Sequence, residues 1–130
     1  MNLLLDTCTF LRLISDYERI PAATLTHLET GNLAVSVICL WEILIKQGKG
    51  LLRIDSDGAP TSLFWRRSCE TLNLRILPVT VNDVAHLENL PAIHRDPFDR
   101  LLICQAIEHG LAIVTPDDHV RRYPVKTLWD

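Results

Sequence analysis

Short apolar runs recur along the chain, and stretches with helical spacing separate them. The first run, residues 3–5, consists of three leucines without polar alternation, as expected for a strand covered on both faces in a parallel sheet. We predict strands at residues 3–5, 33–35, 74–79 and 111–114, with a possible edge strand at 125–129.

The segments between these strands carry apolar residues at helical spacing, with start and stop signals. Ser36 is a natural N-cap, and Gly31 and Gly110 close helices that precede strands. A helix begins at Thr80, and its apolar residues Val84, Leu87 and Leu90 recur every three residues. Pro91 ends this helix. We predict helices at residues 7–14, 21–29, 37–47, 61–72, 80–90, 97–109 and 117–123, and a loop at 51–60. This alternation of short strands and helices predicts an α/β domain with a mainly parallel sheet and right-handed crossovers.

Composition agrees with an ordinary globular protein. The 130 residues are 48% hydrophobic and 22% charged, and we expect residues 1–130 to form a single domain. Every apolar run is far shorter than the ~18 residues that a membrane span needs, and the first residues lack a basic signal-peptide region. We therefore expect a cytoplasmic protein that does not associate with membranes.

Cysteine spacing and net charge exclude several classes of site. The four cysteines show no C-x-x-C spacing, which favours free thiols over a disulfide or a zinc site. A net charge of −3 argues against a general electrostatic binder of nucleic acid. Any contact with nucleic acid must therefore be local.

Two carboxylates stand in the otherwise positive segment of residues 94–100, His-Arg-Asp-Pro-Phe-Asp-Arg, directly before an apolar run. A helix start explains them: Asp96 as N-cap, Pro97 at the first position, and Asp99 where a carboxylate suits the helix dipole. Asp6 directly follows the first predicted strand, and Asp117 follows the fourth after Thr115 and Pro116. In open parallel sheets the functional crevice lies at the carboxyl ends of the strands, although Asp6 and Asp117 are also suitable helix caps.

Glu42 lies within residues 38–45, of which the other seven are apolar, so its helix should be largely enclosed. A buried carboxylate without a partner is costly, and an acid at this position therefore favours a cation or a polar cleft nearby. An ion pair with Lys46, one helical turn later on a narrow exposed stripe, is the alternative.

These acids would converge on one end of the sheet: Asp6, Glu42, Asp99 and Asp117, with Asp96 as a possible fifth. Several carboxylates so close together repel one another, and a bound divalent cation relieves that repulsion. Oxygen-only ligands select Mg²⁺ or Mn²⁺ over zinc. Such an ion can activate water and neutralise charge on a phosphate, so phosphodiester hydrolysis is the natural chemistry.

These residues resemble the PIN-domain ribonucleases, and in particular the VapC toxins of bacterial toxin–antitoxin pairs. The resemblance runs nearly end to end and rests on four segments, of which residues 94–102 are the most specific; the others are residues 3–7, Ser36 with 40–43, and 113–117. It implies a three-layer α/β/α domain with a short central sheet.

The resemblance also implies a function and roles for individual residues. The protein would be a metal-dependent endoribonuclease that is silenced by a small antitoxin, and related proteins commonly form homodimers. The metal would be held by Asp6, Glu42, Asp99 and Asp117, with Thr7, Asp96 and Thr115 in supporting positions. Local cations that could contact RNA phosphates include Lys46, Arg95 and Arg100.

Two positions depart from the family pattern, and one assignment is ambiguous. Cys8 stands where relatives commonly carry His, and Val120 where an aromatic residue is frequent. Asp118 is adjacent to Asp117, but Asp117 has the family's spacing from Thr115.

Two other interpretations use the same acids. In a phosphatase of the haloacid-dehalogenase type, Asp6 would be the nucleophile, but Cys8 is poorly suited to the general acid expected two residues later. In a non-catalytic PIN-like module that binds a protein partner, the acids would serve as helix caps, although capping does not explain Glu42.

Overall fold

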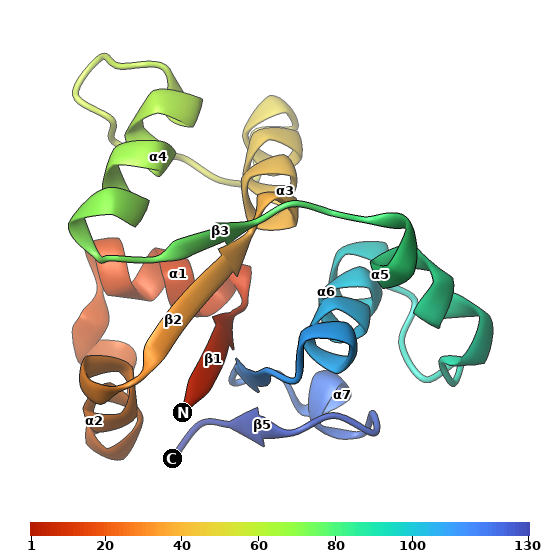
Figure 1. Cartoon of the computed structure of the whole chain (residues 1–130). Coiled ribbons are helices and arrows are strands. Elements are labelled where there is room, and N and C mark those ends of the chain that lie inside the picture. The colour runs from red at the N-terminus through yellow and green to blue at the C-terminus, as the bar shows by residue number, and fades with distance from the viewer.

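The computed structural model describes the whole chain, from Met1 to Asp130, and centres on a five-stranded parallel sheet (Figure 1). The strand order is β3-β2-β1-β4-β5, and every neighbouring pair is parallel. The strands are β1 (Asn2–Leu5), β2 (Asn32–Ser36), β3 (Arg75–Leu77), β4 (Ala112–Val114) and β5 (Thr127–Leu128). All five lie within predicted runs or extend them by a residue or two, and β5 is an edge strand as predicted.

Seven α-helices connect and cover these strands: α1 (Thr7–Ser15), α2 (Ala22–Thr30), α3 (Val37–Gly48), α4 (Thr61–Thr71), α5 (Val81–Ala85), α6 (Pro97–His109) and α7 (Asp118–Arg121). Two short 3-10 helices, Tyr17–Arg19 and His86–Asn89, complete the chain. Gly110 ends α6 in a left-handed conformation with φ 66°, which glycine adopts without strain. The first 3-10 helix was not predicted, because three residues carry too little periodicity to be recognised.

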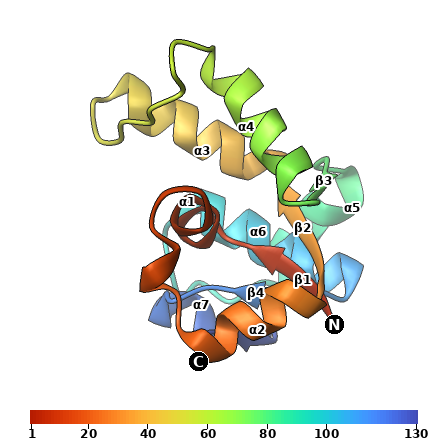
Figure 2. The same cartoon turned by 90° about the vertical axis from the view of Figure 1, so that its left-hand side faces the viewer.

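The sheet lies between two layers of helices because consecutive strand residues point to opposite faces. Leu3 and Leu5 of β1 belong to the core that packs against α1 to α4, whereas Leu4 between them belongs to the core formed with α6 and α7. Figure 1 shows α1, α2 and α4 on one side of the central strands and α6 and α7 on the other, and Figure 2 shows α3 and α4 lying next to each other. The three leucines are fully buried, as predicted from their lack of polar alternation, and the fold is a three-layer α/β/α arrangement.

The helix after Thr80 differs from the apolar pattern of its sequence. Val84 is 43% exposed, whereas Asp83 beside it is fully buried. Asp83 forms a capping box with Thr80 and accepts a hydrogen bond from Gln105 of α6. Polar contacts, rather than the apolar step, therefore fix the orientation of α5.

The carboxyl ends of the central strands provide the starting points of two helices. Asp6 follows β1 and begins α1, and Ser36 ends β2 and caps α3 by accepting a hydrogen bond from the Ile38 N–H. Residues after β4 lie at the same edge, because β4 pairs with β1 in parallel. No helix has the length and apolar character needed to cross a membrane.

Candidate metal centre

Asp6 lies in the gap between β1 and α1 and is only 6% exposed. Its Oδ1 accepts a hydrogen bond from the Thr9 N–H at 2.8 Å, and the Thr9 hydroxyl donates to the Val114 carbonyl of β4. Burial raises the pKa of Asp6, although hydrogen bonds from Thr115 and Thr9 partly offset this effect. The predicted N-cap is therefore real, and the acid is held at the boundary between β1 and β4.

Glu42 enters the same region from α3, and it is also 6% exposed. Its Oε1 accepts a hydrogen bond from the Thr7 hydroxyl at 2.7 Å, and its Oε2 lies 2.7 Å from the Lys46 Nζ. The hydrogen bond to Glu42 raises the pKa of Lys46. Both expectations for Glu42 thus hold in part: the ion pair with Lys46 exists, but the carboxylate is enclosed in a polar cleft and does not lie on an exposed stripe.

Asp96 and Asp99 lie at the start of α6. Asp96 caps the helix, and its Oδ1 accepts hydrogen bonds from the N–H groups of Phe98 and Asp99. Burial, followed by the charges of Asp96, Glu42, Asp117 and Asp6, raises the pKa of Asp99 to about 7. Helix capping therefore accounts for Asp96, whereas the negative charges of the other acids act on the pKa of Asp99.

Asp117 caps α7 and accepts a hydrogen bond from the His119 N–H. Its own N–H donates to the hydroxyl of Thr115, which is fully buried. Asp117 lines the cleft, while Asp118 is exposed and does not line it. Of the two neighbours, Asp117 is thus the one that lies in the cleft, in agreement with the spacing that favoured it in the sequence.

A cleft of about 620 Å³ brings the predicted acids together. Six carboxylates line it: Asp6, Asp16, Glu42, Asp96, Asp99 and Asp117, of which only Asp16 was not singled out from the sequence. Four segments contribute the predicted acids, at residues 6, 42, 96–99 and 117, and the charges of these acids add to the effect of burial in raising the pKa of Asp99. An oxygen-rich, strongly negative donor set fits a hard divalent cation such as Mg²⁺ or Mn²⁺.

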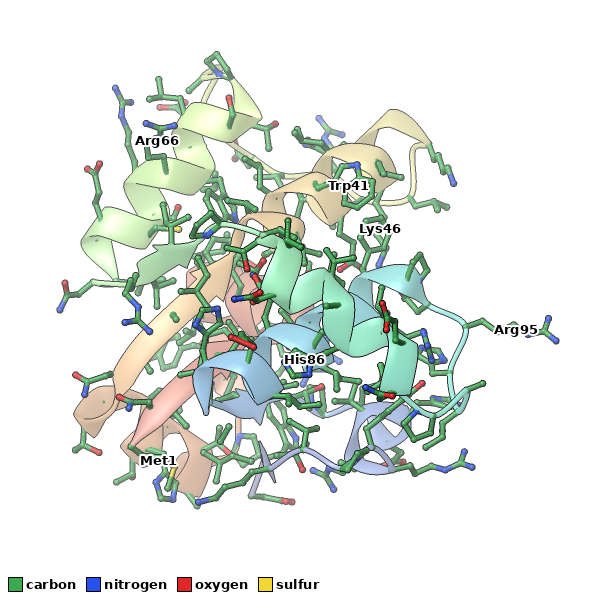
Figure 3. All side chains as sticks on the ribbon, turned by 45° about the vertical axis from the view of Figure 1, so that its right-hand side comes forward. Met1, Trp41, Lys46, Arg66, His86 and Arg95 are labelled. Atoms are coloured by element: carbon green, nitrogen blue, oxygen red, sulfur yellow. The ribbon has the colours of Figure 1, made fainter.

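The predicted supporting and RNA-contacting residues divide into two groups. Thr7 and Lys46 line the cleft, and both contact Glu42. Arg95 is exposed and projects away from the protein (Figure 3). Arg100 donates hydrogen bonds to the Pro91 carbonyl and the Tyr123 hydroxyl, so it holds a loop in place and does not line the cleft.

Two histidines border the acids and were not singled out from the sequence. His94 Nε2 lies 3.3 Å from Asp99 Oδ2, and His119 Nδ1 lies 3.3 Å from Asp117 Oδ1. Their rings stack at a centroid distance of 4.6 Å. His94 stands in the most specific sequence segment, but no sequence signal could have shown that His119 stacks on it.

Helix α1 and the 3-10 helix after it add to the cleft two arginines and a thiol that the site prediction did not include. Arg12, Arg19 and Cys8 line the cleft, with Cys8 one helical turn before Arg12. Burial raises the pKa of the Cys8 thiol, and the charge of Asp6 raises it further. All four cysteines are free, as predicted from their spacing.

The fold and the acidic cleft define a class of α/β domains with an oxygen-ligand site at the carboxyl edge of a parallel sheet. The family model for the PIN domain matches residues 3–126, and the chain therefore belongs to the PIN-domain family. A comparison with curated proteins found no match.

Several solved structures share the fold at low sequence identity. A chain of VapBC2 from Rickettsia felis matches with a TM-score of 0.70 and 17% identity, over 100% of both chains. A chain of VapBC-1 from nontypeable Haemophilus influenzae matches with a TM-score of 0.62 and 16% identity, over 98% of this chain and 97% of that one. A chain of FitAcB from Neisseria gonorrhoeae matches with a TM-score of 0.54 and 21% identity, over 97% of this chain and 96% of that one.

Proposed function

We propose that this PIN domain is a metal-dependent endoribonuclease, a toxin of the VapC type that hydrolyses phosphodiester bonds in RNA. The observation that carries the proposal is the convergence of Asp6, Glu42, Asp99 and Asp117 on one cleft. Each acid comes from a different segment, and helix capping does not explain Glu42, which lies in the interior of α3. A phosphodiester substrate would bring its own negative charge to this cleft, so charge neutralisation is a requirement of the reaction.

The four acids would hold Mg²⁺ or Mn²⁺. When bound, such a cation supplies acidification of an attacking water and neutralisation of charge on the phosphate. Asp96, already committed to the α6 backbone, is a supporting residue. Burial and the neighbouring negative charges both raise the pKa of Asp99, and a cation at the site would favour its ionised form.

Neighbouring residues hold the acids in place. Thr7 and Lys46 each contact one oxygen of Glu42, which fixes the orientation of that carboxylate. Thr115 accepts the Asp117 N–H and thereby positions the start of α7. These contacts preorganise the oxygen atoms before substrate binds, which reduces the rearrangement required during the reaction.

Cleavage of end-labelled single-stranded RNA tests the proposal. The purified chain should cleave after addition of Mg²⁺ or Mn²⁺ and should be inactive in EDTA. Asp6→Asn and Asp99→Asn should each lower the rate by at least about a hundredfold, because each removes a charged ligand at the reaction centre. Asp118→Asn, a change on the exposed neighbour of Asp117, should retain the wild-type rate.

The outcomes separate this proposal from its alternatives. Undiminished cleavage in EDTA, or by both Asn variants, would contradict the metal mechanism. An aspartyl-phosphate trapped at Asp6 during hydrolysis of a phosphomonoester would favour the phosphatase, a reading that membership of the PIN family already disfavours. Tight binding of a protein partner without binding of Mn²⁺ would favour the non-catalytic module.

We further propose that residues 1–130 act as one domain, that the chain forms a homodimer, and that a cognate antitoxin protein inhibits it. Exposed apolar side chains support protein partners: Val37, Trp41 and Leu44 lie on α3, and Val81 of α5 is 84% exposed. Four free thiols are consistent with action in the reducing cytoplasm. Sedimentation equilibrium tests the dimer, and arrest of cleavage on adding the antitoxin tests the inhibitor.

A further inference from the structure

Three cations line the acidic cleft, and they differ in how their charge is used. Lys46 Nζ lies 2.7 Å from Glu42, and Arg19 Nε lies 3.7 Å from Asp16. Arg12 also lines the cleft, but no carboxylate oxygen lies within 4 Å of its guanidinium. Arg12 is therefore the cleft cation whose charge is not already paired within the protein.

Neutral groups hold the Arg12 side chain. Its Cζ lies 5.4 Å from the ring centre of Trp129, which follows the edge strand β5. One guanidinium N–H also points to the Arg19 carbonyl, at a long distance of 3.5 Å. A ring face and a carbonyl orient a guanidinium without cancelling its formal charge, and a planar guanidinium so oriented retains N–H donors for an anion.

The position of Arg12 on α1 relates it to the metal centre. Asp6 caps α1, and Arg12 lies six residues further on, a rise of about 9 Å along the helix axis. Both residues line the same cleft, and the Trp129 ring and the Arg19 carbonyl hold the guanidinium on its wall. An anion bound by Arg12 would thus lie beside the acids, in the same cleft but not on the metal ligands.

We propose that Arg12 binds a backbone phosphate of the substrate next to the one that reaches the acids, and that Trp129 positions Arg12 for this contact. This inference rests on the proposed RNA substrate. RNA carries a phosphate at every nucleotide, so a strand with one phosphate at the metal centre presents another further along the cleft. Arg12 would then set the register of the strand without touching the reacting atoms.

Binding of a short fluorescent single-stranded RNA, followed by anisotropy, tests this contact. The Asp99→Asn protein is used as the background so that RNA stays intact, and Arg12→Gln is added to it. We expect an affinity about five- to tenfold lower and a salt slope smaller by about 0.7, the change for one phosphate contact on a single strand. Arg66→Gln is the matched control, because Arg66 is exposed on α4 outside the cleft (Figure 3).

Two more variants separate phosphate binding from a structural role. Arg12→Lys keeps the charge, so it should retain the salt slope while losing part of the affinity with the planar guanidinium. Trp129→Leu should weaken binding less than Arg12→Gln does, with the salt slope retained. In active protein, Arg12→Gln should raise KM with little change in kcat, since the contact forms before the reaction.

Unchanged affinity and salt slope in Arg12→Gln would overturn the inference, as would equal losses in Arg12→Gln and Arg66→Gln. Loss of antitoxin binding with unchanged RNA binding would overturn it too, and would assign Arg12 to the protein partner. Failure of the nuclease proposal gives a different result. The protein then does not cleave RNA with any metal, whether or not RNA binding depends on Arg12. If Arg12→Gln does not fold, Arg12→Lys decides, because a reduced salt slope in that variant contradicts the inference.

Discussion

Ionisation of a single carboxylate, that of Asp99, lowers the stability of the fold and is also needed for the proposed metal binding. Asp99 lies in the first turn of α6, where the helix dipole favours a negative charge. Burial and four neighbouring acids nevertheless raise its pKa to about 7. The ionised state that the proposed metal binding would require is thus the state that destabilises the metal-free fold, a trade-off typical of functional sites.

The pH dependence of stability follows from this shift. An aspartate whose pKa rises from 3.8 to about 7 on folding binds more protons in the folded state between these two values. Its contribution to stability is complete below 3.8 and is lost as the pH rises through about 7. The metal-free protein should therefore melt several degrees lower at about pH 8 than at about pH 6, and saturating Mg²⁺ at about pH 8 should reverse this loss.

Thermal denaturation of variants assigns the effect to the residue. Asp99→Asn should raise the melting temperature of metal-free protein at about pH 8 and flatten its decline with pH, because the amide carries no charge. Asp118→Asn, on an exposed acid outside the cleft, should follow the wild-type curve. A wild-type melting temperature that rises steadily between about pH 6 and 8 would contradict the raised pKa of Asp99.

Most of the site's acids could be predicted from local signals, and most of its cations could not. Asp6 and Asp117 follow strand runs directly, and Glu42 stands out because its neighbours are apolar. Arg12 gives no such signal, since an arginine on an amphipathic helix is ordinary until the tertiary structure places Trp129 against it. The charge of a side chain is visible in the sequence, but whether that charge is paired depends on residues far away.

At the scale of elements, α5 is the case in which the apolar pattern misleads. Its buried position is taken by Asp83, which receives hydrogen bonds from Thr80 and Gln105 and contacts His109 at 3.1 Å. Burial by itself would raise the pKa of Asp83, but hydrogen bonds from Thr80 and Gln105, together with His109, hold it below its ordinary value. Periodicity cannot reveal such a network, because its polar partners come from α6, more than twenty residues later.

This network should be structural. Asp83→Ala removes the capping box and leaves polar partners on α6 without their acceptor, so it should lower the free energy of unfolding by about 2–3 kcal/mol. Asp83 does not line the cleft, and the cleavage rate per folded molecule should remain that of the wild type. Urea denaturation and active-site-normalised rates measure the two quantities.

Glu88→Gln serves as the comparison, because Glu88 is exposed in the adjacent 3-10 helix. It should change the free energy of unfolding by less than about 0.5 kcal/mol. Equal stability of the Asp83→Ala and wild-type proteins would show that the buried contacts do not hold α5 to α6.

At the scale of the whole molecule, the parallel sheet explains why acids distant in sequence meet. β1 and β4 are neighbours in space although about a hundred residues separate them, so Asp6 and Asp117 follow adjacent strands at one edge. Strand and helix alternation predicted this architecture, because each element buries a face against the next. The shortness of β3 and β5 and the stacking of His94 on His119 depend on packing across the sheet, which the linear pattern does not encode.

The central claim is that four acids from separate segments form one metal centre, and Glu42 tests it best because helix capping does not explain that residue. Isothermal titration with Mn²⁺ should show saturable binding to the wild type. Loss of a group that only orients a metal ligand weakens affinity by about tenfold or more, so Glu42→Gln should bind Mn²⁺ at least that much more weakly. Glu70→Gln, on the exposed surface of α4, should match the wild type. Equal Mn²⁺ affinity in the wild type and Glu42→Gln, or no saturable binding by the wild type, would contradict the account.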